Sequence, residues 1–176
     1  RPETVIVFHD GFRLLRWGGW FRRAGMRNVM LDTHQYLIAM EDPLFSGPAR
    51  RLYLRSRRLP WLYRMLVGAS GIAIRSAARR IPVLVGEWCV ENQWALHSQN
   101  RSAAYRQVSR LQRAAWDVSA GQIYWSYQLA RSAEPGSGEG KPPRDPRNGG
   151  NLEAWDLTRV WRHGWIRADT SHDDVP

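Results

Sequence analysis

The chain has 176 residues, of which 43% are hydrophobic and 11% aromatic, and it carries a formal net charge of +10. This length and composition are those of a globular protein with one hydrophobic core. No apolar run approaches the roughly 18 residues of a membrane span, and the single cysteine, Cys89, excludes an intrachain disulfide or a thiolate metal cluster.

The positive charge comes mainly from arginine and is concentrated between Arg50 and Arg80. An excess of basic residues of this size suggests nucleic acid or an anionic membrane surface as a partner. Because these arginines alternate with apolar residues, the segment is typical of the polar face of packed helices. We therefore predict no nucleic-acid partner, and a basic module that binds polyanions is kept as an alternative.

Two short apolar segments near the start each lead into polar side chains. Residues 4–8 (TVIVF) predict a buried strand that runs into the polar loop 9–11 (HDG). A short helix is expected over 20–26. Residues 28–31 (NVML) predict a second strand, and the polar residues 32–36 (DTHQY) follow it directly.

The next segment is predicted to be a loop and then helical. Residues 41–47 (EDPLFSG) have the composition of a loop, and Pro48 suits the first turn of a helix. Helical spacing of apolar residues runs over 52–80, with interruptions at Pro60 and at 68–71. We expect a helix pair or a kinked helix that packs on the sheet, in preference to a membrane-surface role.

Residues 81–90 (IPVLVGEWCV) predict a third strand that is buried on both faces, as in a parallel sheet covered by helices. Glu87 is expected at the C-terminal end of this strand, between Gly86 and Trp88. In barrels of alternating strands and helices, catalytic groups are found at that end of the strands. Glu87 is therefore the first candidate for a catalytic residue.

The rest of the chain continues the alternation of helix and strand. Residues 102–118 predict an amphipathic helix, and 122–127 predict a fourth strand. Residues 133–150 are rich in Pro, Gly and charge and predict a long loop. A short helix is expected over 152–161, and the tail over 168–176 is polar and expected to be disordered.

Four strand-then-helix units in series predict an α/β fold with a parallel sheet and right-handed crossovers. A closed (β/α)8 TIM barrel needs about 250 residues. The predicted domain, residues 1–167, is therefore about half of a (β/α)8 barrel with its loops.

The predicted strand ends carry polar or aromatic side chains that converge on one mouth; these are His9, Asp10, His34, Tyr36, Glu87, Trp88 and Trp125. Their order, in the segments HDGF, DTHQY, VGEW and YWSYQL, resembles glycoside hydrolase family 5. The likeness is greatest to its exo-β-1,3-glucanase-like members and covers nearly the whole chain. It implies the C-terminal half of the family's barrel, about strands five to eight.

The resemblance implies a role for each matching residue. Glu87 matches the nucleophile, which forms a glycosyl-enzyme intermediate in a retaining mechanism. His34 and Tyr36 match the pair that orients and tunes the catalytic carboxylates. Trp125 matches the platform under the sugar. His34, Tyr36 and Trp125 each have a purely structural interpretation as well. The ordered set as a whole favours the functional interpretation.

Further residues are expected to contact the substrate. Asp10 and Phe12 match positions that line the leaving-group side, and His9 and Trp88 lie next to matched residues. The implied substrate is a β-glucoside, most plainly a β-glucan, and the implied chemistry needs no cofactor and no metal. The ten tryptophans fit this reading, because indole faces pack on sugar rings.

The chain departs from the family's pattern in one essential place. A retaining glycosidase needs two carboxyl groups, and the family's acid/base glutamate lies in an Asn-Glu-Pro motif that this sequence lacks. Because the sequence begins with Arg1 and soon reaches a strand, we expect the natural N-terminus and the acid/base to lie upstream. The fragment alone is then expected to be inactive.

One further alternative is a non-catalytic relative that binds carbohydrate through the same cleft. Transglycosylation in place of hydrolysis would use the same residues. The sequence leaves open the linkage preference, exo or endo action, the oligomeric state and the location in the cell.

Overall fold

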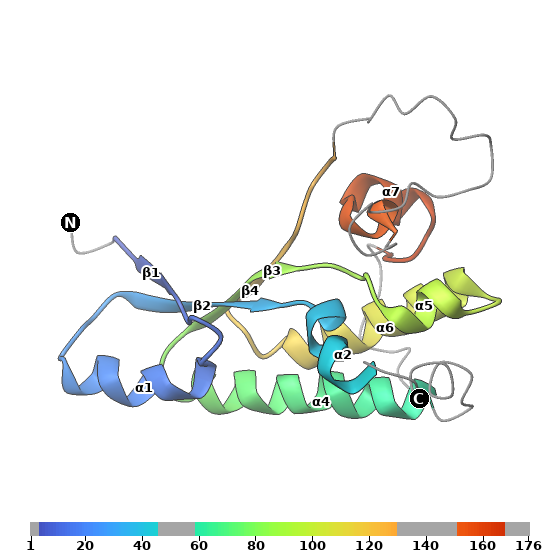
Figure 1. The fold of residues 1–176 in the computed structure, drawn as a ribbon. Coiled ribbons are helices and arrows are strands. Elements are labelled where there is room, and N and C mark those ends of the chain that lie inside the picture. The colour runs from blue at the N-terminus through green and yellow to red at the C-terminus, as the bar shows by residue number, and fades with distance from the viewer. Residues whose placement is uncertain (1–3, 46–58, 130–150, 168–176) are drawn as a thin grey trace.

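The computed structural model of the chain describes residues 4–45, 59–129 and 151–167. These residues contain a sheet of four parallel strands in the order β1-β2-β3-β4 (Figure 1). The strands are β1 (Ile6–His9), β2 (Val29–Gln35), β3 (Val83–Trp88) and β4 (Gly121–Tyr124). The predicted α/β class with a parallel sheet is confirmed, and the sheet within the described ranges is open.

Three helices cover one face of the sheet, namely α1 (Leu14–Arg23), α4 (Leu59–Ala78) and α6 (Arg101–Trp116) (Figure 1). Four shorter helices complete the described elements: α2 (Leu37–Phe45), α5 (Gln93–His97), the 3₁₀ helix η1 (Leu152–Trp155) and α7 (Leu157–Arg162). No helix in the described ranges is long and apolar enough to cross a bilayer.

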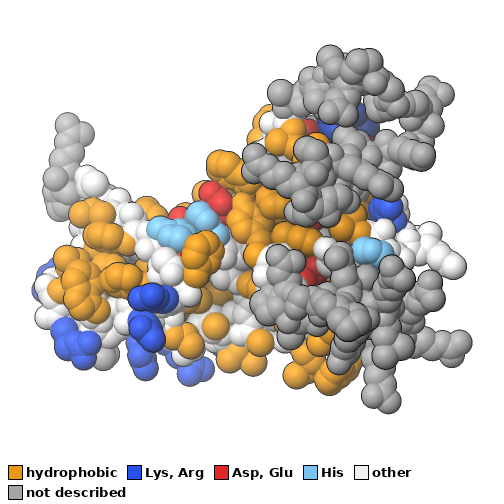
Figure 2. Space-filling view, viewed as in Figure 1, with side chains coloured by type: hydrophobic (Ala, Val, Ile, Leu, Met, Phe, Trp, Pro, Cys, Tyr) orange, Lys and Arg blue, Asp and Glu red, His pale blue; other side chains and the backbone are white. Residues whose placement is uncertain are grey.

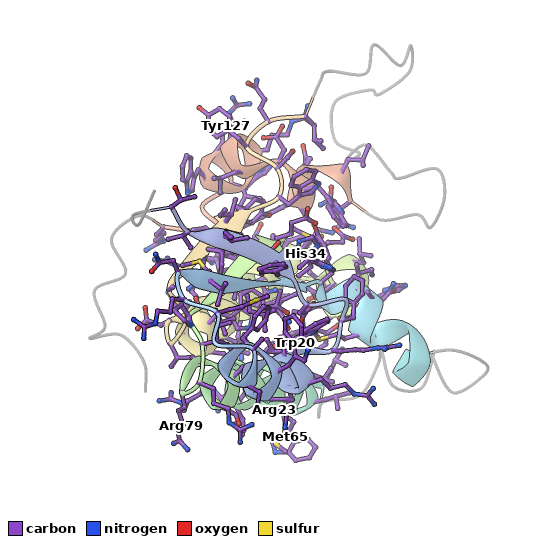
Figure 3. The ribbon with its side chains drawn as sticks, turned by 90° about the vertical axis from the view of Figure 1, so that its left-hand side faces the viewer. Trp20, Arg23, His34, Met65, Arg79 and Tyr127 are labelled. Carbon is purple, nitrogen blue, oxygen red and sulfur yellow. The ribbon has the colours of Figure 1, made fainter. Side chains whose placement is uncertain are left out.

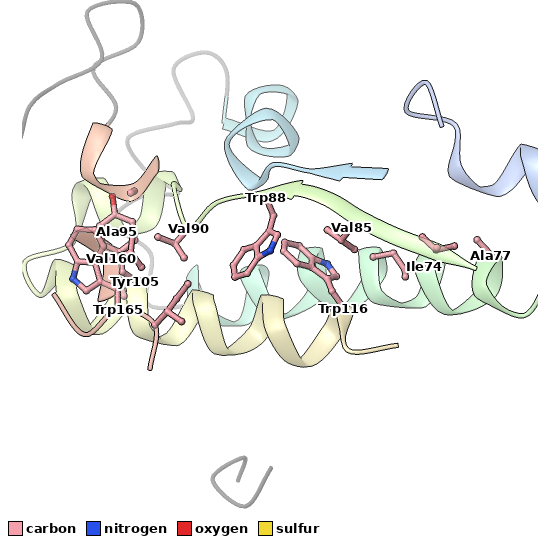
Figure 4. Close-up of a cluster of buried hydrophobic side chains, with 14 residues drawn as sticks. Ile74, Ala77, Val85, Trp88, Val90, Ala95, Tyr105, Trp116, Val160 and Trp165 are labelled. Atoms are coloured by element: carbon pink, nitrogen blue, oxygen red, sulfur yellow. The ribbon is translucent and has the colours of Figure 1, made fainter. Parts of the chain in front are cut away.

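The core lies between the sheet and the helices. In β2 the buried residues alternate with partly exposed ones, because successive side chains of a strand point to opposite faces. Trp88 of β3 packs against Trp116 of α6, with ring centroids 5.2 Å apart, and Val85 and Ile74 extend this cluster (Figure 4). The helix-facing side of the sheet therefore holds the protein together.

Within the described ranges no helix layer covers the other face of the sheet, and part of this face is apolar. Val7 and Ile123 are each 50% exposed, and Met30 and Leu84 lie between them in the sheet. This set, Val7, Met30, Leu84 and Ile123, is called the open face below. Strand β1 is exposed along its whole length because it lies at the edge of the described sheet, so the prediction of a buried strand over 4–8 is wrong.

Two predicted breaks are wrong. Residues 41–45 are helical, in α2, because buried Glu41 accepts hydrogen bonds from Tyr63 and from the backbone of Gln93. Helix α4 runs through 68–71 without a break. Pro60 lies in its first turn, where the missing N–H has no helical partner. The expected helix start at Pro48 lies outside the described residues, as do the predicted loop over 133–150 and the tail.

Several element ends differ from those predicted. Helix α1 begins at Leu14 and ends at Arg23, so it starts and ends earlier than the predicted 20–26, and β4 ends at Tyr124, short of the predicted 127. The predicted helix over 152–161 is divided at Asp156, whose side chain accepts from the N–H of Arg159 and caps α7. The short helix α5 was not predicted, and Asn92 caps it in the same way.

Two glycines inside α4 have opposite surroundings, and they give a matched test of helix packing. A Cβ on Gly71 would lie 2.8 Å from the carbonyl oxygen of Ala115 in α6, whereas a Cβ on Gly68 would meet nothing within 4 Å. We expect Gly71→Ala to lower the free energy of unfolding by about 1–3 kcal/mol, because backbone must move. Gly68→Ala should raise it by about 0.5–1 kcal/mol through helix propensity.

Urea denaturation followed by circular dichroism measures both changes. Equal effects of the two substitutions would show that α4 and α6 do not approach each other closely at Gly71.

Candidate active site

Four polar side chains meet at the C-terminal ends of β2 and β3. Asp32 and His34 are two residues apart in β2, so they share one side of the strand. The pairing of β2 with β3 places His34 beside Glu87, and Tyr36 follows β2 directly. The set Asp32, His34, Tyr36 and Glu87 is called the carboxylate cluster below.

His34 lies between the two carboxylates of the cluster. Its Nδ1 is 3.1 Å from Oε2 of Glu87, and its Nε2 is 3.1 Å from Oδ2 of Asp32. The phenol of Tyr36 donates to the same Oε2 of Glu87 at 2.7 Å. Glu87 is 24% exposed, so a small molecule can reach it. Both contacts therefore hold the same carboxylate oxygen, Oε2.

Tyr36 is held as a hydrogen-bond donor to Glu87. Burial raises the pKa of its phenol well above the usual range, and the hydrogen bond to the Glu87 carboxylate raises it further. The phenol therefore keeps its proton at any pH at which the protein is studied. Its ring stacks on Trp155 of η1, with centroids 5.2 Å apart. Stacking fixes the ring, and the raised pKa fixes its protonation.

A β-bulge directs Glu87 to the open side of the sheet. The pairing of β2 with β3 passes over Gly86, which is one extra residue in β3. In a regular strand, Glu87 would share the buried side of Val83 and Val85, because side chains alternate. The extra residue turns Glu87 outward and turns Trp88 into the core.

Asp32 lies directly over the bulge and was not predicted to belong to the site. A Cβ on Gly86 would lie 2.0 Å from Oδ1 of Asp32, so only glycine fits while Asp32 keeps its place. The sequence carries a signal for Asp32, since a spacing of two from His34 places both on one face of a strand. The predicted strand ended at residue 31, and this hid the relation.

His9 and Phe12 extend the site toward β1, and their predicted contact with substrate stays a prediction. The His9 ring lies 4.3 Å from that of His34, and the Phe12 ring lies edge-on at 5.3 Å from His9. Phe12 is 76% exposed. An exposed aromatic ring beside polar groups is a surface that suits the apolar face of a sugar. Figure 2 shows histidine and acidic side chains together on this part of the surface.

Asp10 is buried, which the sequence did not predict. It is 1% exposed, and its carboxylate accepts from the hydroxyl of Thr33 and from the backbone N–H of Phe12, each at 2.8 Å. Thr33 in turn accepts from Gln35, which accepts from Ser70 of α4. This chain of hydrogen bonds fixes the loop that carries Phe12. Asp10 therefore positions the loop, and because it also lines the cavity beside the site, its predicted contact with substrate stays a prediction.

The two predicted tryptophans lie in different surroundings. Trp88 is 4% exposed and packs against Trp116 and Tyr124 on the helix side of the sheet, so its assignment as a substrate contact is corrected. Trp125 follows β4, is 50% exposed, and donates its backbone N–H to the carbonyl of Trp88. The peptide bond after Trp125 is cis. Trp125 is thus available to a ligand at the strand ends.

A cavity of about 520 Å³ flanks the carboxylate cluster. It is lined by residues of the site and by residues of α2 and α4, including Asp10, Phe12, His34, Tyr36, Met40 and Leu66. Glu87 is not among the described residues that line it. The cavity therefore lies beside the cluster, on the side of α4, and adds space next to His34 and Tyr36.

Comparisons with known proteins assign the chain to no family. No protein-family model matches the chain, and no curated protein is significantly similar to it. Within the described ranges, no group of three or more His, Cys, Asp and Glu side chains is arranged to hold a metal ion. Functional assignment therefore depends on the residues of the site.

The close approach of Gly86 and Asp32 predicts a strong coupling between them. We expect Gly86→Ala to lower the free energy of unfolding by about 1–3 kcal/mol, because its Cβ displaces Asp32. In an Asp32→Ala background the same change should be milder by about 1 kcal/mol or more. Chemical denaturation of the two single variants and the double variant measures the coupling.

Gly121→Ala is the matched control in the neighbouring strand β4. A Cβ there would meet only Leu84, at an ordinary distance of 3.4 Å, so its effect should not depend on Asp32. Additive effects of Gly86→Ala and Asp32→Ala would contradict the contact.

Proposed function

We propose that the chain belongs to a retaining glycoside hydrolase that cleaves β-glucosidic bonds, resembles glycoside hydrolase family 5, and uses Glu87 as its nucleophile. The observation that carries this proposal is the contact of one carboxylate oxygen, Oε2 of Glu87, with both the Tyr36 phenol and His34 Nδ1. Two contacts on one oxygen orient the second oxygen toward a ligand. An oriented and accessible carboxylate is what nucleophilic catalysis at a sugar requires.

The proposed reaction proceeds in two displacements. Oε1 of Glu87 attacks the anomeric carbon, the glycosidic C–O bond breaks, and the leaving oxygen takes a proton from a general acid. Water then attacks the same carbon, gives its proton to that group, and releases Glu87. The described residues supply the nucleophile and its positioning groups. In this proposal the acid/base carboxyl lies on a part of the barrel outside the described strands.

Exposure of the sheet supports a barrel rather than an isolated sheet. The open face carries Val7 and Ile123 at 50% exposure each, in the outer strands β1 and β4. Closing the four parallel strands with four more would cover this apolar face and pair both edges. The carboxylate cluster would then lie at the C-terminal mouth, where barrel enzymes carry their catalytic groups.

Sugar recognition is proposed for the exposed aromatic residues around the mouth. Phe12 and Trp125 lie at the ends of β1 and β4, on the two sides of the carboxylate cluster. Their exposed rings offer apolar faces, and the imidazole of His9 lies beside Phe12. A non-catalytic carbohydrate-binding protein could use the same three residues, but it would gain nothing from orienting Glu87.

A mechanism-based label tests the nucleophile without needing the general acid. We expect 2,4-dinitrophenyl 2-deoxy-2-fluoro-β-glucoside to form a covalent adduct on Glu87, because dinitrophenolate leaves unprotonated. Mass spectrometry of peptides from the longest natural polypeptide that contains this chain locates the adduct. Tyr36→Phe should slow labelling roughly tenfold or more, since it removes one hydrogen bond to the nucleophile.

Glu87→Gln should abolish the label, and Glu153→Gln, which changes a carboxylate bound to His163 elsewhere, should leave it unchanged. A label on another carboxylate would show that Glu87 is not the nucleophile, whereas binding of laminarin without any labelling would favour the carbohydrate-binding alternative.

A further inference from the structure

Helix α4 has a second apolar stripe on the side that faces away from the sheet. Trp61, Met65 and Ile72 are 61%, 54% and 71% exposed. Spacings of four and seven residues place the three side chains along one line of the helix. Leu59, Tyr63, Val67, Gly71, Ile74 and Ala77 form the buried stripe of the same helix. Residues Trp61, Met65 and Ile72 are called the outer stripe below.

Barrel closure would leave the outer stripe uncovered. The open face of the sheet lies on the side opposite α1 and α4 (Figure 1), so additional strands would cover that side alone. The neighbours of α4 in the helix layer are α1 and α6, which pack against its flanks. A partner of the outer stripe must therefore approach from outside the helix layer.

Arginine side chains border the outer stripe along α4. Arg64, Arg75 and Arg79 are exposed on the same side of α4. No Asp or Glu occurs in α1, nor anywhere from residue 43 to residue 86. In Figure 3, Arg23, Met65 and Arg79 project from the side of the helix layer away from His34. This surface is therefore both basic and apolar.

Helix α1 continues the same surface next to α4. Leu15 and Trp20 are 57% and 43% exposed, and Arg16 and Arg23 are exposed beside them. Gly18 lets α1 approach the end of α4, because a Cβ there would lie 3.0 Å from Arg80. Leu15 lies on the flank of α1 that carries Gly18 and approaches α4, so it extends the outer stripe, and Trp20, five residues further on, lies on the other flank of α1.

We propose that this face of α1 and α4 binds the surface of an anionic lipid bilayer. Side chains of the outer stripe enter the region between headgroups and acyl chains, and the arginines contact lipid phosphates and carboxylates. Helices that lie in a membrane interface combine these features: Trp and aliphatic residues on one line, and basic residues beside it. Helix α4 lies on the surface in this arrangement and does not cross it.

The composition of the outer stripe favours lipid over nucleic acid. Binding of nucleic acid through its phosphates would use only the arginines, so it would give the exposed side chains of Ile72 and Met65 no role. A bilayer interface accepts both kinds of side chain, because apolar atoms are buried while basic groups stay at the headgroups. Nucleic-acid binding is therefore one of the outcomes that the test distinguishes.

Sedimentation with vesicles tests the proposal and does not depend on the proposed hydrolase activity. We expect the chain to bind vesicles of phosphatidylcholine with phosphatidylserine and to bind pure phosphatidylcholine much more weakly. The triple variant Trp61→Ser, Met65→Ser, Ile72→Ser should weaken binding roughly tenfold or more. The variant Arg64→Ser, Arg75→Ser, Arg79→Ser should weaken binding to a similar degree and reduce its salt dependence.

The matched control removes apolar surface of the same kind from the other side of the sheet. Val7→Ser with Ile123→Ser should leave vesicle binding unchanged, because the open face points away from the membrane. Brominated lipids provide a second measurement, in which quenching of tryptophan fluorescence should fall in Trp61→Phe. Circular dichroism establishes that each variant is folded.

Three results would overturn the proposal. The first is failure of the folded chain to bind anionic vesicles. The second is an equal loss of binding in the open-face control and in the outer-stripe variant. The third is tighter binding to a DNA duplex than to vesicles, with the DNA affinity insensitive to the outer stripe, which would assign the surface to a polyanion.

Discussion

The single extra residue at Gly86 decides the geometry of the whole candidate site. Strand β3 is buried on its helix side at Val83 and Val85, and strict alternation would put Glu87 on that side as well. A carboxylate there would enter the packing around Trp116 and would need a charged partner. The bulge reverses the alternation at the one position where a carboxylate follows. The apolar core and the polar site can therefore share one strand.

The bulge is itself held by contacts on both sides. Oδ1 of Asp32 occupies the space that a Cβ on Gly86 would need. On the other side of Glu87, the side chain of Trp88 is anchored in the core. Beyond Trp88 the backbone is irregular, and two buried carboxylates fix it. Glu41 accepts from the N–H of Gln93 at 2.9 Å, and Glu91 accepts from the N–H of Asn151 at 3.1 Å. Side-chain hydrogen bonds thus replace the strand ladder where the chain leaves the sheet.

Local patterns predicted the architecture but not the ends of its elements. Apolar runs and helical spacing were enough for the parallel sheet and for α4 and α6, because both signals arise from burial of one face. The polar segment 32–35 looked like a loop, although it completes β2: Asp32 and His34 face the site, while Thr33 and Gln35 bond to Asp10 and Ser70. Partners distant in sequence satisfy these polar groups, and no local pattern reports them.

The same limit of local sequence patterns explains why some predicted site residues lie elsewhere in the structure. The sequence places His34, Tyr36 and Glu87 at neighbouring strand ends, and the parallel register brings them into contact. It cannot decide which face a residue takes after a bulge, so Trp88 was expected at the surface and lies in the core. The burial of Asp10 was missed for a related reason, since the hydroxyl that binds it comes from the next strand.

Exposed apolar residues on two opposite sides of the molecule require two different explanations. The open face lies on parallel strands, and within the described ranges the outer strands β1 and β4 form the edges of the sheet, so more strands of the same kind fit it. The outer stripe lies on a convex helix that has no free backbone groups along its length, and arginines surround it. A strand cannot pair with such a helix, whereas a fluid anionic surface can adapt to it. One partner could not satisfy both surfaces, because the sheet and the helix layer separate them.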